Sequence, residues 1–414
     1  MVIRDGCPYG QFWRIAVALY DIVDNEHIDR FKEIKANDPN AKPFQQVMAL
    51  RSLSCIVARW LSEQVMKNCS RQTISDFVTR WPTIHKWILH LKEEYVDNCS
   101  VDIEFRIATK RSLVDFIGLA SHTSLAHFLP TAFHSPLISH TLFSLWRLEM
   151  QDRRFYCPTN CPGELGLPDI YTTPGILDCC QARLVFGQEW NWDEIIRQSF
   201  DNDGKIMGLV ALSQLRSDME LFPMNYDRII SDLHLLTVFS LKMDVRMAIL
   251  RHGSMPTVVG LMSFLVNAEH PPNVHPLVAK ALSFATWYIR AYVEDTDALP
   301  WITQVLEAGI LKAMVLIEPY IQHLPSSEWQ FLHELFREVI PRYTVYQSIL
   351  KLLVKYVKEI EEAGWAKKFE KENSPISNAW GILNIEVESK QPLLGATPGL
   401  NLNTCQNIKV TCLQ

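Results

Sequence analysis

The chain has 414 residues, 48% of them hydrophobic and 21% charged, proportions typical of a globular protein that exclude a disordered or fibrous one. A formal net charge of −6 and the lack of any long Lys/Arg run argue against nucleic-acid binding. No stretch reaches the roughly 18 to 20 apolar residues of a membrane span, and Met1–Pro8 resembles no signal peptide. We therefore expect an intracellular protein, cytoplasmic or nuclear, that binds no membrane.

Apolar residues recur at helical spacing along most of the chain, whereas the alternating pattern of strands is scarce and only 16 residues are glycine. This pattern predicts helices over residues 12–24, 44–67, 83–96, 103–120, 135–150, 204–221, 225–240, 255–267, 277–293, 300–322, 326–340, 344–364 and 379–387. Helices of this length with short breaks favour antiparallel neighbours. The predicted fold class is all-α, an irregular armadillo- or HEAT-like helical-repeat solenoid or a superhelical stack of antiparallel helix pairs.

Two of these segments show the helical pattern in most detail. In the helix after Pro276, an apolar stripe is formed by Leu277, Ala281, Phe284, Tyr288 and Tyr292, with Lys280 and Arg290 on the polar back. In the later helix, Thr344 and Gln347 have capping-box spacing, and Gly364 marks the expected end.

Changes in composition divide the chain into four predicted parts. Residues 1–152 form a helical block, and residues 153–174, rich in Pro and Gly, form a loop. An armadillo-like helical block follows over 175–371. Residues 372–414 supply a short helix and a flexible tail, the remnant of a zinc-finger entrance.

The densest thiol cluster consists of Cys157, Cys161, Cys179 and Cys180. Four thiolates could hold zinc, but adjacent cysteines such as Cys179 and Cys180 do not chelate one ion together easily. In a reducing compartment we expect free thiols used as small hydrophobic side chains, with no disulfides and no metal here.

Histidines crowd the region of His122, His127, His134 and His140, without the H-E-x-x-H spacing of a zinc protease. We expect them at loops and helix ends. The segment Asp201-Asn202-Asp203-Gly204-Lys205 resembles the start of a calcium loop, but Ile206 and Leu212 stand where an EF-hand needs glycine and glutamate, so a helix-opening turn is predicted. The motifs G-x-S-x-G, G-x-x-x-x-G-K and G-x-G-x-x-G are absent.

Two stretches resemble armadillo repeats: Arg251-His252-Gly253-Ser254-Met255-Pro256 with the apolar run after it, and Glu307-Ala308-Gly309-Ile310-Leu311 with its continuation. In that family a short helix ends at a glycine and the next helix starts at once. Gly253 and Gly309 fit this corner, where glycine tolerates positive φ. Their separation exceeds one unit of about 40 to 47 residues, so the repeat would be irregular.

The order of features over about residues 270–412 resembles fungal proteins with an armadillo-like helical region followed by a MYND-type zinc finger. The resemblance is carried by Trp287-Tyr288, Leu299-Pro300-Trp301-Ile302, Glu307-Ala308-Gly309-Ile310-Leu311, Trp380 and Cys405-Gln406-Asn407-Ile408-Lys409-Val410. It implies a helical body attached to a zinc module that binds peptide motifs. Cys405 and Cys412 cannot build that module alone. We therefore expect the finger to be truncated or missing here, and zinc to bind only if a complete finger follows in a longer product.

These observations predict a non-enzymatic protein–protein interaction scaffold with an unknown protein partner and no catalytic, cofactor-binding or metal-ligating residues in this chain. Of its 12 tryptophans we expect most in the core and a minority on a partner surface. The alternative is a helical enzyme, metal-dependent or a transferase, without a recognisable motif, whose site would lie in the His122–His140 region. The Asn-His-x-Cys signature of the methyltransferases that carry MYND fingers is absent.

Overall fold

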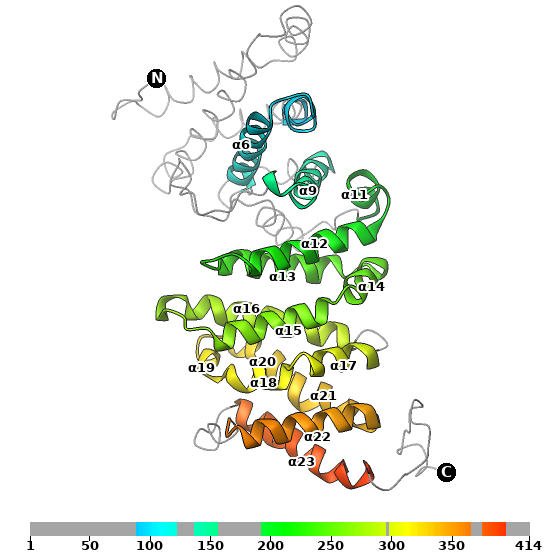
Figure 1. Ribbon diagram of the computed structural model, residues 1–414, viewed down its shortest axis with the longest axis vertical. Coiled ribbons are helices and arrows are strands. Elements are labelled where there is room, and N and C mark those ends of the chain that lie inside the picture. Colours follow the sequence, from blue (N-terminus) through cyan, green and yellow to red (C-terminus); the bar gives the residue numbers. More distant parts are fainter. Residues whose placement is uncertain (1–87, 122–135, 156–191, 295–297, 366–374, 395–414) are drawn as a thin grey trace, which may run out of the picture. The chain divides into compact units, whose positions relative to one another are not determined.

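A computed structural model describes residues 88–121, 136–155, 192–294, 298–365 and 375–394 of the chain. Within these ranges every regular element is a helix and none is a strand, which confirms the all-α class (Figure 1). The chain divides into two units, residues 1–210 and 211–414. The helices predicted over 12–24 and 44–67, most of the loop predicted over 153–174 and the end of the predicted tail lie outside the described residues. The predicted four-part division stays a prediction.

The first unit contains η1 (Lys92–Val96), α6 (Ile103–Ser121), α9 (Pro136–Gln151), η2 (Arg153–Phe155), α11 (Trp192–Ser199) and the first part of α12 (Gly204–Met219). Helix α9 packs on α11, and α6 packs on η1. Their shared core includes the fully buried rings of Phe143, Trp146, Phe155 and Phe200. An ion pair between Lys110 on α6 and Glu149 on α9 is buried in the same unit.

The second unit continues α12 and adds a series of helices that pack on one another. They are α13 (Tyr226–Phe239), α14 (Met243–Arg251), α15 (Ser254–Asn267), η3 (Pro272–Val274), α16 (His275–Glu294), α17 (Leu299–Glu307), α18 (Ile310–Leu316), α19 (Glu318–Ile321), α20 (Ser326–Glu334), η4 (Leu335–Val339), α21 (Ile340–Arg342), η5 (Tyr343–Val345), α22 (Gln347–Glu362), α23 (Pro375–Lys390) and η7 (Gln391–Leu394). Helix α16 packs on α13 and on α20, α15 packs on α16 and α18, and α22 packs on α23.

Two sharp corners interrupt this series at the predicted glycines. Gly253 has φ +82° and Gly309 has φ +92°, the left-handed region that glycine enters without a steric penalty. The chain turns by 64° between α14 and α15 and by 58° between α17 and α18 (Figure 1). The expectation of a glycine corner is confirmed at both positions.

Among the described residues, no single helix has the length and apolar composition to cross a membrane. Only α14 with α15, or α17 with α18, would reach that threshold when both members of a bent pair are counted together.

Several helix boundaries differ from the prediction. The segment that periodicity predicted as one helix over 300–322 is α17, α18 and α19. Helix α11 was not predicted, and α14 was implied only by the armadillo resemblance, as the short helix before Gly253. The capping box at Thr344 is absent, because α22 begins at Gln347 after Tyr346 without a side-chain cap. Thr344 instead donates from Oγ1 to the Pro341 carbonyl and accepts from Lys390 Nζ at 2.7 Å. The hydroxyl that the spacing assigned to a helix cap is therefore used in other hydrogen bonds, one of them to the distant Lys390.

The stripe predicted along the helix after Pro276 is partly correct. Ala281, Tyr288 and Tyr292 on α16 are buried, while Leu277 and Phe284 are half-buried. Near the end of the chain, the short helix predicted over 379–387 is the centre of the longer α23.

Candidate protein-binding surface

Most residues singled out for metal or zinc chemistry lie outside the described residues: Cys157, Cys161, Cys179, Cys180, His122, His127, His134, Cys405 and Cys412. In the ranges that the structure does describe, no group of three or more His, Cys, Asp or Glu side chains could hold a metal ion.

His140 is the one member of the predicted histidine group within the described ranges. It lies on α9 with Nδ1 2.9 Å from the Ser199 hydroxyl at the end of α11. Burial lowers the pKa of His140, nearby Lys92 lowers it further, and Asp97 opposes both. A neutral imidazole beside a hydroxyl could in principle act as a general base. Ser199, however, is only 3% exposed, so its hydroxyl offers no surface to a substrate, and the pair serves to join α9 to α11.

The turn before α12 behaves as a helix opening, as predicted. Asp201 and Asn202 have positive φ, and the Asp203 carboxylate accepts a hydrogen bond from the Lys205 amide at 2.9 Å, just inside the start of the helix. The Asp201 carboxylate is paired with Arg147 at 2.5 Å, which lowers the pKa of Asp201 through that hydrogen bond. These groups are occupied by the fold.

Among the described residues, tryptophan side chains are divided evenly between the core and partly exposed positions, so fewer lie in the core than expected. Trp146, Trp301 and Trp380 are buried, whereas Trp287, Trp329 and Trp365 are half-buried. The half-buried rings already contact other side chains of the same unit: Trp287 meets Phe284, Trp329 meets His333, and Lys312 lies over Trp365. None of these three rings is among the exposed large hydrophobic side chains of the described residues.

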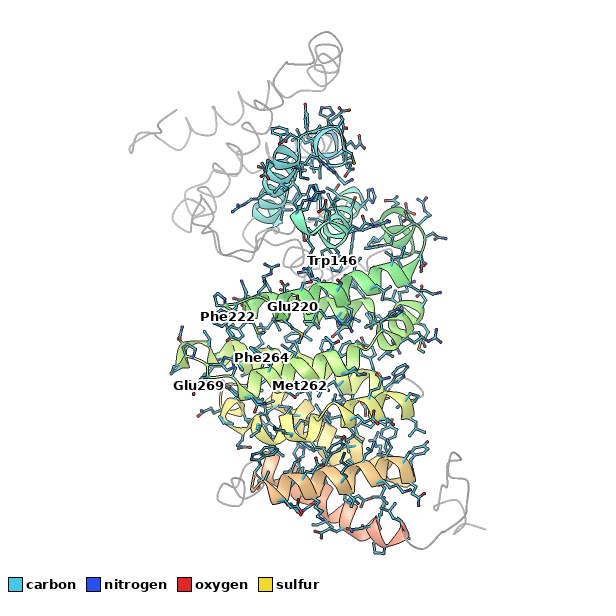
Figure 2. All side chains as sticks on the ribbon, in the orientation of Figure 1. Trp146, Glu220, Phe222, Met262, Phe264 and Glu269 are labelled. Carbon is cyan, nitrogen blue, oxygen red and sulfur yellow. The ribbon has the colours of Figure 1, made fainter. Side chains whose placement is uncertain are left out.

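Among the described residues, the most exposed large aromatic side chains lie at one end of the second unit. Phe222, in the turn between α12 and α13, is 94% exposed, and Phe264, near the end of α15, is 49% exposed. Figure 2 shows Phe222 beside Glu220 at the end of α12, and Phe264 and Glu269 at the end of α15. A fully exposed phenylalanine does not gain the roughly 1.5 to 3 kcal/mol that burial of its side chain would supply. Two exposed phenylalanines at one end of the unit therefore do not serve folding stability, which points to another role.

Two sets of hydrogen bonds bring these segments together. Arg216 on α12 donates from Nε to Thr257 Oγ1 on α15 at 3.1 Å and from Nη2 to the His252 carbonyl at 2.7 Å. Farther along both segments, the Tyr226 hydroxyl lies 2.8 Å from His270 Nδ1. The earlier residue of one segment, Arg216, thus contacts the earlier part of the other, and the later residue, Tyr226, contacts its later part. The two segments therefore run in the same direction, and Phe222 and Phe264 lie toward the same end of the unit.

The support beneath this end is a row of ring contacts. His270 Nε2 lies 2.7 Å from the Leu265 carbonyl, which can only accept, so that nitrogen carries the proton and Nδ1 faces the Tyr226 hydroxyl. Tyr320 contacts both His270 and His275, and His275 contacts His323. Burial raises the pKa of Tyr226, and burial with the neighbouring Tyr226 raises that of Tyr320, so both phenols keep their protons at neutral pH.

Acidic residues lie near the two phenylalanines in the sequence. Glu220, Asp227 and Glu269 are exposed, and neither 217–227 nor 261–275 contains a lysine or arginine. Within the described part of the chain, no ion pair engages these three carboxylates. We call the group Glu220, Phe222, Asp227, Phe264 and Glu269 the acidic-aromatic end.

Comparison of the chain with protein-family models, with curated proteins and with solved structures finds no significant match.

The acidic-aromatic end was not predicted from the sequence. Its one available signal was the acidic character of 217–227 around Phe222, between Arg216 and Arg228, and of Glu269 after Phe264. Helical periodicity could not reveal Phe264, because α15 is apolar on nearly every side.

Proposed function

We propose that the protein is a non-enzymatic scaffold that binds another protein through its acidic-aromatic end. The observation that carries this proposal is the 94% exposure of Phe222 at the same end as Phe264. Aromatic side chains, phenylalanine included, are enriched in the cores of protein interfaces relative to the rest of the surface. A partner that covered both rings would recover burial energy that the folded monomer leaves unused.

The setting of these rings also favours binding. Glu220 and Glu269 form a polar rim next to an apolar centre, the usual anatomy of a protein interface. The hydrogen bonds from Arg216 and Tyr226 fix the two segments before any partner arrives. A surface that is already ordered loses less conformational entropy on binding.

A photo-crosslinking experiment tests the proposal. p-Benzoyl-phenylalanine replaces Phe222 in the full chain inside cells, and a matched variant carries it at Leu241, which is 67% exposed in the turn between α13 and α14. We expect a crosslinked protein at position 222 that is absent at position 241 and is lost when Phe264→Ser is added. No adduct at 222, or the same adducts at both positions, would contradict the proposal.

We also propose that the second unit is an irregular armadillo-like stack. Its support is the repeated arrangement of a short helix, a positive-φ glycine and a second helix at Gly253 and Gly309, together with the packing of α16 on both α13 and α20. An experimental structure in which α13–α15 and α16–α18 superpose as equivalent units would support it, and failure to superpose would refute it.

The narrower proposal is kinship with fungal MYND-type zinc finger proteins, supported by the order of Trp287, Leu299–Ile302, Gly309 and Trp380 along α16 to α23. The transcript sequence beyond the codon for Gln414 tests it. Paired cysteines with a histidine in frame would support kinship and bring zinc with them. An in-frame stop would remove this proposal and leave the scaffold proposal unchanged.

A further inference from the structure

Resting on the proposed function, we infer that the partner segment bound at the acidic-aromatic end carries lysine or arginine side chains beside aliphatic ones. The carboxylates of Glu220, Asp227 and Glu269 give this end one sign of charge, and no lysine or arginine in 217–227 or 261–275 offsets it. Charge complementarity of this kind governs which partners associate and how fast.

The two phenylalanines further restrict which side chains the partner segment can carry. The exposed faces of Phe222 and Phe264 attract cations through the ring quadrupole and also accept apolar contact. Lysine and arginine meet both needs, because their methylene stems cover a ring while the charged head reaches a carboxylate. Aliphatic side chains next to them would cover the remaining ring area.

The same charges disfavour other occupants. An acidic or phosphorylated peptide, a nucleic acid or an anionic lipid surface would bring negative charge against Glu220 and Glu269. A second copy of this end, docked about a two-fold axis, would place the same carboxylates against one another. A basic and aliphatic protein segment is therefore the occupant that this surface favours.

Fluorescence anisotropy with the full chain tests this chemistry. The probe is a fluorescein-labelled peptide of repeated Lys-Leu-Leu-Lys units, and two matched probes carry glutamate for every lysine or serine for every leucine. We expect the first probe to bind at least about tenfold more tightly than either matched probe, with an affinity that falls as salt rises from roughly 50 to 300 mM.

Variants locate that binding on the protein. Phe222→Ser with Phe264→Ser should weaken the Lys/Leu probe about tenfold. Glu220→Lys with Glu269→Lys should weaken it by a similar factor and flatten its salt dependence. The controls are Leu241→Ser, and Glu307→Lys with Glu359→Lys, which change exposed residues of the same unit in the α13–α14 turn and on α17 and α22. They should stay within about twofold of the unmodified chain.

Equal binding of the lysine and glutamate probes, or equal losses in the controls and the test variants, would overturn the inferred partner chemistry. If position 222 still crosslinks a partner in cells in that case, the scaffold proposal stands and only the basic, aliphatic partner fails. If the crosslink is missing as well, both proposals fail. Far-ultraviolet circular dichroism of each variant confirms that a lost signal reflects the surface and not unfolding.

Discussion

Asp218 and Arg228 form an almost completely buried ion pair between the end of α12 and the start of α13. Arg228 Nη2 lies 3.0 Å from Asp218 Oδ1, and the two side chains are 4% and 1% exposed, respectively. Asp218 Oδ2 also accepts from Gln214 Nε2 at 2.6 Å and from Arg228 Nε at 3.3 Å. This pair lies in the helices on either side of the turn that presents Phe222, so it holds the scaffold of the proposed binding surface.

Replacing one partner of that pair should be costly. Arg228→Met leaves the Asp218 carboxylate buried without its cation, and we expect a loss of about 3 to 5 kcal/mol in the free energy of unfolding. Adding Asp218→Leu should restore much of the loss, since apolar pairs of similar volume replace buried ion pairs well. Urea unfolding followed by tryptophan fluorescence measures both variants. A double variant as unstable as the single one would contradict this account.

The glycine corners permit a matched stability test. A Cβ at Gly309 would meet nothing within 4 Å, so the cost of Gly309→Ala is set by its φ of +92° alone. We expect a loss of about 1 to 2 kcal/mol. Gly260, inside α15, also has open space around a Cβ but helical backbone, so Gly260→Ala should instead gain about 0.5 to 1 kcal/mol. Differential scanning calorimetry gives both shifts, and shifts of equal sign would argue against the corner.

Phe222 and Phe239 should respond in opposite ways to truncation. Phe222→Ser removes a side chain that is 94% exposed and should leave the free energy of unfolding within about 0.5 kcal/mol of the original value. Phe239→Ala empties a fully buried position on α13 and should cost about 3 to 5 kcal/mol. Guanidinium unfolding compares them. A large loss for Phe222→Ser would show that the ring serves folding and not binding.

The His140–Ser199 pair predicts a dependence of stability on pH. Burial lowers the pKa of His140 below the 6.5 of the unfolded chain, so the unfolded state binds more protons around and below that pH. The contribution of this histidine is therefore present above about pH 6.5 and is lost as pH falls through the lower folded-state pKa. His140→Asn keeps a polar side-chain atom near the position of Nδ1 and cannot titrate.

Thermal unfolding between about pH 7.5 and 5 should show a smaller decline for His140→Asn than for the original chain. Equal declines would mean that this histidine does not carry the effect. The same variant bears on the enzyme alternative, since a general base could not be replaced by asparagine without loss of activity.

Local patterns predicted those parts of the fold that depend on local chemistry. Gly253 and Gly309 could be assigned to corners because positive φ is a property of one residue and its neighbours. Helices such as α6 and α13 agreed with periodicity to within a few residues at each end. The capping box at Thr344 failed because residues 343–345 form the short helix η5 and α22 begins only at Gln347, while the Thr344 hydroxyl bonds to the Pro341 carbonyl and to Lys390, a partner far along the chain that sequence spacing cannot indicate.

The surface was harder to predict than the core. Val258, Val259, Leu261, Met262 and Leu265 of α15 are all fully buried, so the apolar sequence around Phe264 gives no face a distinct character. Packing against α16, α17 and α18 decides that Phe264 remains outside while Met262 lies inside. Likewise, Tyr226 on α13 and His270 in the loop after α15 come together only through tertiary packing, so no motif search would have paired them.

The division between the two units has a practical consequence for dissecting the molecule. The boundary falls between Val210 and Ala211, inside the continuous helix α12. A recombinant fragment that began at Ala211 would therefore lack the first turns of this helix, on which the hydrogen bonds of the later turns build. Starting instead at Asp203, whose carboxylate caps the first turn through the Lys205 amide, would preserve the whole helix. The natural site for separating the halves is thus the turn before the helix.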